Sequence, residues 1–291
     1  MAKKTRVILI MSLAIIFTVI TPLVIGYSLG YRIDLENKKI TQTGGFYFKG
    51  WPRNAQIFLD GKLVKRTDPF FGAAYIYNLI PKNYDVEIRK DDYHSWKKTL
   101  QVVQKQVTDA KNVILLPKNP AFEELAQNAA KMPPSAVTSS ENSVKIDYYI
   151  DEETQVLYLF DEAAGSFENL FEEAKGAKLS PDAKKLLYFS NSEIWVLFLK
   201  EELGQPRRYP GDKVLVARFA QKVSDVFWMD DYYLVFSVGE KIKVAEIDDR
   251  EGLNIVDLAE FAEPKIFFSH ENKRLYVLSE GNLYASSALI P

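Results

Sequence analysis

The 291-residue chain contains no cysteine and only two histidines, His94 and His270. The absence of cysteine excludes disulfide bonds, thiolate nucleophiles and cysteine metal ligands. Because the two histidines lie far apart in the sequence, a histidine-based metal site could draw only one such ligand from each part of the chain. An exported chain of this composition would depend on its hydrophobic core alone for stability.

The chain also lacks an excess of charge of either sign, since 37 Lys and Arg residues are balanced by 39 Asp and Glu residues. A net charge of -2 offers no basic surface for nucleic acid. The sequence has no glycine-rich phosphate loop, no GxSxG, no HExxH and no EF-hand spacing. We therefore expect no nucleic-acid partner, no cofactor and no metal.

The clearest positive feature is an uncharged apolar run over residues 7–31. It is long enough for a helix to cross about 30 Å of hydrocarbon. Lys3, Lys4 and Arg6 crowd the short flank before it, and the positive-inside bias then predicts a cytoplasmic stub at 1–6. We expect a single-pass signal anchor in the cytoplasmic membrane, with the bulk of the chain extracytoplasmic.

A cleaved signal peptide is the alternative for the same segment. Gly26-Tyr27-Ser28 has the small-x-small form of a cleavage site, although a signal peptide has a shorter apolar segment of about 7–15 residues.

Residues 39–117 consist of short runs of alternating apolar and polar residues, each of a length suited to a strand. In "YDVEIRK" the apolar side chains would face one way and the charged ones the other, as in a strand with one wet face. Asp60-Gly61 has the composition of a hairpin turn. The region is therefore predicted to be an antiparallel β domain.

The same region resembles a PEGA domain, a small extracytoplasmic β-sandwich. The matching segments are Pro52-Arg53-Asn54-Ala55, "IFLDG" from Ile57, the Thr67-Asp68-Pro69 turn and "NLIPKNYDVEIRKDDYHSWKKTLQV" from Asn78. The sequence departs from the family where Arg53-Asn54 replace Glu-Gly, where Lys82-Asn83 stand at the Pro-Gly turn, and where Asp92 precedes Tyr93. Asn and Asp are also common turn residues, so we expect these turns to be retained, with left-handed backbone geometry at Asn83.

Residues 118–143 are rich in Pro, Ala, Ser and Asn and are predicted to be a linker. A short helix is expected within it near "AFEELAQNAAK".

Residues 144–291 contain a degenerate repeat of two apolar strands and a polar turn. Ser190, Ser237 and Ser279 occupy equivalent positions, and a spacing of about 40–50 residues is typical of propeller blades. The first copy, "LSPDAKKLLYFSNSEIWV", resembles the Ser-Pro-Asp-Gly repeat of TolB-type β-propellers, with Ala183 in place of glycine. A partial copy near Ile146 brings the expectation to three or four blades, either closed or as a shortened propeller.

Catalytic residues are not expected. Adjacent carboxylates such as Asp230-Asp231 are usually solvated, because neighbouring side chains on a strand point to opposite faces. Asp182 is expected to hold its turn by hydrogen bonds. His270 occupies the same repeat turn as Pro181 and Asp230, which favours a structural role, and a surface or packing role is expected for His94.

Aromatic surfaces are the remaining candidate for ligand binding, since the chain has 16 Tyr, 18 Phe and 4 Trp. The tracts "FFGAAYIY" and "DDYHSW" could form such a surface, and Tyr93 and Trp96 are the residues that we expect to contact a ligand there.

Together these observations predict an all-β protein after a transmembrane helix, with a PEGA-like sandwich followed by a short or partial β-propeller. The expected function is a non-enzymatic, membrane-anchored interaction or scaffolding module of the cell envelope, with an envelope protein or polysaccharide as partner. One alternative is a receptor for a glycan or small ligand. Another is a propeller-based hydrolase, which would gather Asp182, Asp230 and Glu271 at one mouth of the channel.

Overall fold

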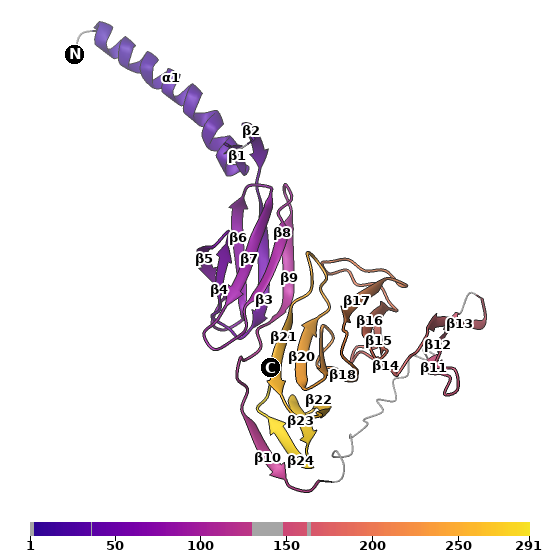
Figure 1. Ribbon diagram of the computed structural model, residues 1–291. Helices are drawn as coiled ribbons and strands as arrows, with labels where there is room; N and C mark the ends of the chain where they lie inside the picture. Colours follow the sequence, from indigo (N-terminus) through magenta and orange to yellow (C-terminus); the bar gives the residue numbers. More distant parts are fainter. Residues whose placement is uncertain (1–2, 36, 130–147, 162–163) are drawn as a thin grey trace.

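The computed structural model describes residues 3–35, 37–129, 148–161 and 164–291. The protein is mostly β, with one N-terminal helix (Figure 1). A first group of strands lies between the helix and a second, larger group of sheets.

Helix α1 (Lys3–Ser28) is apolar along almost its whole length and contains Pro22. The segment Lys4–Ser28 has a mean hydropathy of 2.8, and none of it is buried against the rest of the chain. Its length and composition suit a membrane anchor or a signal sequence. A two-stranded hairpin of β1 (Tyr31–Asp34) and β2 (Lys39–Gln42) connects the helix to the first β domain.

The first β domain consists of two sheets that share one core. The three-stranded sheet has the order β6 (Ala73–Leu79), β3 (Gly44–Trp51), β9 (Val107–Ile114). The four-stranded sheet has the order β5 (Lys62–Arg66), β4 (Gln56–Leu59), β7 (Asn83–Arg89), β8 (Trp96–Gln101). Only the β3–β9 pair is parallel in these two sheets, so the expected antiparallel character holds for the other pairs.

Local sequence explains the turns of this domain. Asp60 and Gly61 have φ angles of 49° and 75°, and they close the predicted β4–β5 hairpin. Asp92 has a φ of 67°, a left-handed geometry that glycine adopts most readily. The expectation of left-handed geometry at Asn83 is wrong, because Asn83 begins β7 and the left-handed residue before it is Asn78.

The alternation predicted for "YDVEIRK" is confirmed. Tyr84, Val86 and Ile88 are buried in the core between the two sheets. The charged residues between them lie on the wet face of β7. Period-two burial of this kind fixes which face of a strand meets the core.

The second group of strands forms four sheets in chain order. The first contains β11 (Tyr148–Ile150), β12 (Leu157–Asp161) and β13 (Ser166–Phe171). The second contains β14 (Gly176–Leu179), β15 (Lys185–Phe189), β16 (Glu193–Phe198) and β17 (Lys213–Arg218). The third contains β18 (Val223–Trp228), β19 (Tyr233–Val238), β20 (Lys241–Glu246) and β21 (Ile255–Glu260).

The fourth sheet is completed by a strand from an earlier part of the chain. Its order is β22 (Lys265–Ser269), β23 (Arg274–Ser279), β24 (Asn282–Ser286) and β10 (Phe122–Ala126). The short helix expected near "AFEELAQNAAK" is therefore wrong, because β-pairing with β24 satisfies the backbone of this segment. The described part of the expected linker thus includes a strand of the last sheet, and residues 130–147 lie outside the described residues.

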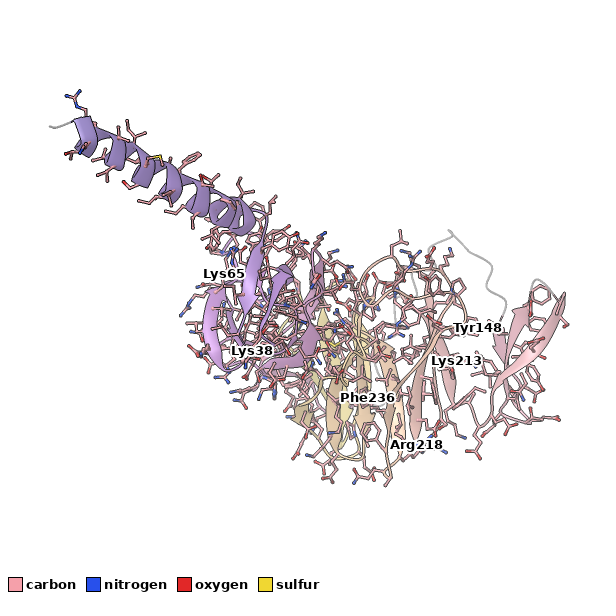
Figure 2. The ribbon with its side chains drawn as sticks, turned by 90° about the horizontal axis from the view of Figure 1, so that it is seen from above. Lys38, Lys65, Tyr148, Lys213, Arg218 and Phe236 are labelled. Atoms are coloured by element: carbon pink, nitrogen blue, oxygen red, sulfur yellow. The ribbon has the colours of Figure 1, made fainter. Side chains whose placement is uncertain are left out.

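The four sheets pack side by side through three apolar clusters. One cluster joins the first and second sheets, another the second and third, and another the third and fourth. Phe236 lies within the stack, whereas Tyr148 lies toward its far end (Figure 2). Ser190, Ser237 and Ser279, the equivalent serines of the sequence repeat, are all buried.

Candidate functional site

The joint between the two β domains contains one of the two aromatic residues selected from the sequence. Trp96 is only 3% exposed, and its indole Nε1 donates a hydrogen bond of 2.7 Å to Glu246 of β20. Tyr93 is partly exposed and packs edge-on against Trp51, with ring centroids 5.8 Å apart. Trp96 is therefore a residue of the joint and not of an exposed aromatic surface.

Strand β8 also supplies a buried cation to the joint. The Nζ atom of Lys98 lies 2.6 Å from Glu246, and both side chains are almost completely excluded from solvent. The same ammonium donates hydrogen bonds of 2.5 Å to the carbonyls of Asp248 and Gly252. Burial raises the pKa of the Glu246 carboxyl, while Lys98 and the other donors around it oppose that shift. The ion pair is the kind that a protein tolerates only when all its hydrogen bonds are satisfied.

Two side-chain amides clamp the backbone of the first domain. The amide of Asn254 accepts a hydrogen bond from the backbone N–H of Lys97 and donates one to its carbonyl, at 3.2 and 3.1 Å. Gln205 does the same on β9, accepting from Asp109 N–H at 3.0 Å and donating to Val107 C=O at 3.1 Å. Each amide imitates a neighbouring strand at the edge that it covers.

Further bonds cross the joint nearby. Arg250 donates to the Asp109 carbonyl at 2.8 Å, and the backbone N–H of Ile114 donates to the Tyr233 hydroxyl at 2.9 Å. Leu116 joins the apolar cluster of the third and fourth sheets. The two β domains are thus connected by packing and by many hydrogen bonds, and they form one unit.

A cavity of about 330 Å³ opens at this joint. Its walls come from β8 and β9 of the first domain and from the second and third sheets of the second domain. The aromatic members of the lining are Trp96, Phe198, Tyr232 and Tyr233, and the charged members are Lys111, Lys184, Glu201, Glu202, Arg208, Glu246, Asp248 and Arg250. A concave site between domains is a common place for ligand binding.

Arg208 is held in this wall by its own loop. Its backbone pairs with that of Glu202 through two hydrogen bonds, and its side chain forms an ion pair with Asp249. The guanidinium lies 5.4 Å from the ring centre of Phe198. Its Nε atom is buried and has no hydrogen-bond partner. Buried donors are almost always satisfied in folded proteins, so this atom is an exception among the described residues.

The repeat turns expected to be structural adjoin this cavity, because Lys184 and Tyr232 of its lining belong to them. Asp182 accepts hydrogen bonds from Ser180, Lys184 and Lys185, and its pKa is lowered because these bonds outweigh its partial burial. Its backbone N–H donates to Asp231 of the next sheet at 2.8 Å. Burial raises the pKa of the Asp231 carboxyl. Asp182 thus holds its turn, as the sequence indicated.

The two histidines lie in separate places. Burial lowers the pKa of His94, which lies at the joint, and its Nε2 atom is a second buried atom without a hydrogen-bond partner. Burial also lowers the pKa of His270, whose ring meets Phe268 edge-on at 5.6 Å. Within the described residues no group of three or more His, Asp or Glu side chains could hold a metal ion.

Comparisons with known proteins give only distant structural similarity. No protein-family model and no curated protein matches the chain. Among solved structures it is similar to the β-propeller domain of Cps50 (Swd1) from Myceliophthora thermophila, with 11% identity, a TM-score of 0.34 and coverage of 88% of this chain and 91% of that one. It is similar at the same TM-score of 0.34 to YCF48 from Cyanidioschyzon merolae, with 10% identity and coverage of 89% and 98%.

A gluconolactonase from Xanthomonas campestris is also similar, with 14% identity, a TM-score of 0.34 and coverage of 72% of this chain and 68% of that one. The neighbours are β-propeller proteins, in keeping with the repeated sheets. Likeness at this level says nothing about activity.

Sequence reasoning selected Trp96 but missed the charged residues around it. Lys98 and Glu246 each occupy a position that alternation assigns to the buried face of its strand, beside Leu100 and Val244. A charged residue on a predicted apolar face was the available signal. Nothing in the sequence alone indicates the orientation of Arg208.

Proposed function

We propose that the protein is a non-enzymatic, membrane-anchored interaction module of the cell envelope. The observation that carries this proposal is the attachment of an exposed apolar helix to one continuous β unit through the short β1–β2 hairpin. Figure 1 shows the helix projecting away from both β domains. A protein built in this way holds a fixed surface at a fixed distance from a membrane.

The resemblances of the sequence support the same role. A PEGA-like first domain would be the membrane-proximal spacer, and a TolB-like second domain would present sheet edges and turns to a partner. Propeller-type folds commonly serve as interaction platforms, and the partner expected here is an envelope protein or polysaccharide. The Asp182 carboxylate already accepts hydrogen bonds from residues of its own turn. This structural role argues against its use as a catalytic group in a propeller-based hydrolase.

The orientation can be tested by single-cysteine labelling, because the natural chain has no cysteine. Lys4→Cys and Lys213→Cys would be expressed separately in intact cells and treated with a membrane-impermeant maleimide. Labelling of K213C alone is expected, with K4C labelled only after permeabilisation. Labelling of K4C in intact cells, or of K213C only after permeabilisation, would contradict the proposal.

The interaction role can be tested with photo-crosslinking residues introduced at exposed positions of β17 and β13 in native membranes. One recurring protein or glycan adduct is expected at neighbouring positions of one edge. The matched control is the same probe at a buried position of the sheet that contains β17, such as Leu187 of β15 (0% exposed), which should give no adduct with another molecule. Absence of adducts at every exposed position would count against a scaffold.

A receptor for a small ligand is the second candidate function. The cavity of about 330 Å³ at the joint favours it, because its size falls within the range of known ligand sites.

A further inference from the structure

The hairpin of β1 and β2, directly after helix α1, has its polar side chains buried and its apolar side chains exposed. Asp34 and Thr41 are each only 2% exposed. Ile33 and Ile40, in contrast, are 67% and 72% exposed, and they lie directly opposite each other in the antiparallel register. In a half-buried strand of a water-soluble sheet the apolar side chains face the core and the polar ones face water. The hairpin reverses this arrangement, so its outer face is not adapted to water.

Hydrogen bonds hold the polar side chains on the inner face. The Thr41 hydroxyl accepts a hydrogen bond of 2.6 Å from the side-chain amide of Gln104, which belongs to the first β domain. The Asp34 carboxylate accepts bonds from the backbone N–H and the side-chain amide of Asn37, at 3.0 and 2.9 Å. A polar group can be buried at low cost only when it is paired in this way. These bonds therefore fix which face of the hairpin turns outward.

The outer face contains more apolar side chains than the isoleucine pair. Tyr31 lies on the same face of β1 as Ile33, and Leu35 follows this strand; both side chains are exposed. Lys38 and Lys39, in the turn and at the start of β2, are exposed beside them. Several apolar side chains on one face, bordered by lysines, are typical of an element that lies in a lipid interface. The outer apolar face consists of Tyr31, Ile33, Leu35 and Ile40.

The hairpin is fixed beside the end of the apolar helix (Figure 1). Residues 29–30 alone separate α1 from β1. Arg32 donates a hydrogen bond of 2.9 Å to the Tyr27 carbonyl, and its guanidinium lies 3.5 Å from the centre of the Tyr27 ring. The same guanidinium donates to the Asn78 side chain of β6 at 3.3 Å, so it joins the helix, the hairpin and the first β domain. A membrane that holds α1 would therefore have its surface at the hairpin.

We propose that the outer apolar face of the β1–β2 hairpin lies in the headgroup region of the bilayer that α1 spans. The lipid surface covers the apolar side chains, and the two lysines beside them contact lipid phosphates. A two-stranded sheet has outer edges that its own ladder does not satisfy, so the hairpin stays in the hydrated interface and does not enter the hydrocarbon. This second lipid contact restricts tilting of the first β domain. The inference rests on the proposed membrane-anchored function.

The test uses the full chain in vesicles of phosphatidylcholine and phosphatidylglycerol. Because the natural chain has no cysteine, a polarity-sensitive fluorophore can be attached to the single-cysteine variants Ile33→Cys and Ile40→Cys. The matched control is Phe71→Cys, an exposed apolar position just before β6 begins, whereas Asn78 lies near the other end of that strand. Ile15→Cys, near the middle of α1, reports on the anchor itself. The quenchers are iodide in water and nitroxide groups attached near the start or near the end of the lipid acyl chains.

The expected depth of the hairpin decides which quencher acts on each probe. Interfacial apolar faces lie about 5–10 Å into the boundary between headgroups and acyl chains. The I33C and I40C probes should therefore be protected from iodide and quenched more strongly by the shallow nitroxide than by the deep one. The I15C probe should show the reverse order of the two nitroxides, and the F71C probe should be quenched by iodide alone.

A double substitution tests whether the apolar pair causes the contact. Ile33→Ser/Ile40→Ser changes only exposed side chains, so the fold should be retained. With the probe at Leu35→Cys, this variant should lose quenching by the shallow nitroxide and gain quenching by iodide. Phe70→Ser/Phe71→Ser removes another exposed apolar pair from the same domain and should leave the L35C probe unchanged.

Shallow-nitroxide quenching of both hairpin probes, lost in the isoleucine variant, would support the proposal. Iodide quenching of the hairpin probes equal to that of F71C would overturn it. Protection from both iodide and the nitroxides would also overturn it, because a second copy of the chain would then cover this face. Absence of nitroxide quenching at I15C would contradict the membrane anchor itself, whereas normal quenching at I15C without quenching in the hairpin would contradict this inference alone.

Discussion

The Nζ atom of Lys98 lies 2.6 Å from the carboxylate of Glu246, and the two residues come from different β domains. Neither side chain is appreciably exposed, and the carboxylate also accepts hydrogen bonds from Trp96 and Asn254. The ammonium bonds two carbonyls of the loop after β20. This polar network makes the joint between the domains specific as well as tight.

Removal of either Lys98 or Glu246 should lower the stability of the folded protein. Lys98→Met leaves Glu246 buried without its counter-ion and is expected to lower the free energy of unfolding by about 3–5 kcal/mol. A urea titration of the detergent-solubilised chain, followed by tryptophan fluorescence, measures this change. The matched control is Lys97→Met on the same strand, where an exposed lysine lies 3.5 Å from Glu87 and the loss should stay below about 1 kcal/mol. Equal losses for the two variants would contradict a buried pair.

The amide of Asn254 gives a second prediction for the same joint. Asn254→Ala removes both hydrogen bonds to the Lys97 backbone and should destabilise the protein by about 1–2 kcal/mol. Asn254→Asp should destabilise the protein more than Asn254→Ala does. In this variant a carboxylate replaces the amide donor that lies 2.6 Å from Glu246, so two negative charges would repel each other. Hydrogen exchange should become faster in β8 in both variants. Asn272→Ala, which loses two exposed bonds, one to the Tyr276 hydroxyl and one from the Arg274 backbone N–H, serves as the control and should leave β8 exchange unchanged.

Local patterns in the sequence predicted much of the chain. Three features depend only on residues close together in the chain, and they could be predicted from the sequence: the apolar run, the strands with period-two alternation and the Asp60-Gly61 turn. The strand at Phe122–Ala126 could not be read in this way. Its residues have helical composition, and it becomes a strand because β24 offers an unpaired edge.

The site was less accessible to prediction for a related physical reason. Trp96 was selected as an exposed ring, but its burial depends on Glu246, which lies 150 residues later. The buried lysine and glutamate could have been flagged as charges on apolar faces, yet their pairing requires the packing of two domains. The orientation of Arg208 depends on a loop whose course is set by contacts with β9.

The turn at Ala183 predicts a stabilising substitution. Ala183 has a φ of 52°, in the region where glycine is free of the steric cost that a Cβ imposes. Ala183→Gly should therefore stabilise the protein by about 1 kcal/mol and raise the unfolding temperature by about 2 °C. The same substitution at Ala177, inside strand β14, should have the opposite sign, because glycine weakens a strand. Destabilisation by Ala183→Gly would show that the turn gains nothing from glycine.

The two histidines predict a loss of stability on mild acidification. Burial lowers the folded-state pKa of His94 and of His270, and Lys118 and Lys273 respectively act in the same direction, whereas Asp257 and Asp231 oppose it. Below the unfolded value of about 6.5 the unfolded chain therefore binds more protons than the folded chain, and stability falls as the pH decreases from about 7 toward the lowered folded values.

Thermal unfolding of the natural chain, His94→Gln, His270→Gln and the double variant between pH 7.5 and pH 5.5 measures this contribution. Each single variant should flatten the decline in this window, and the double variant should flatten it most. Carboxylates with lowered pKa values, such as Asp182 and Asp257, lose their contribution only at lower pH and do not interfere. An identical slope for all four proteins would show that neither imidazole is kept neutral by its burial.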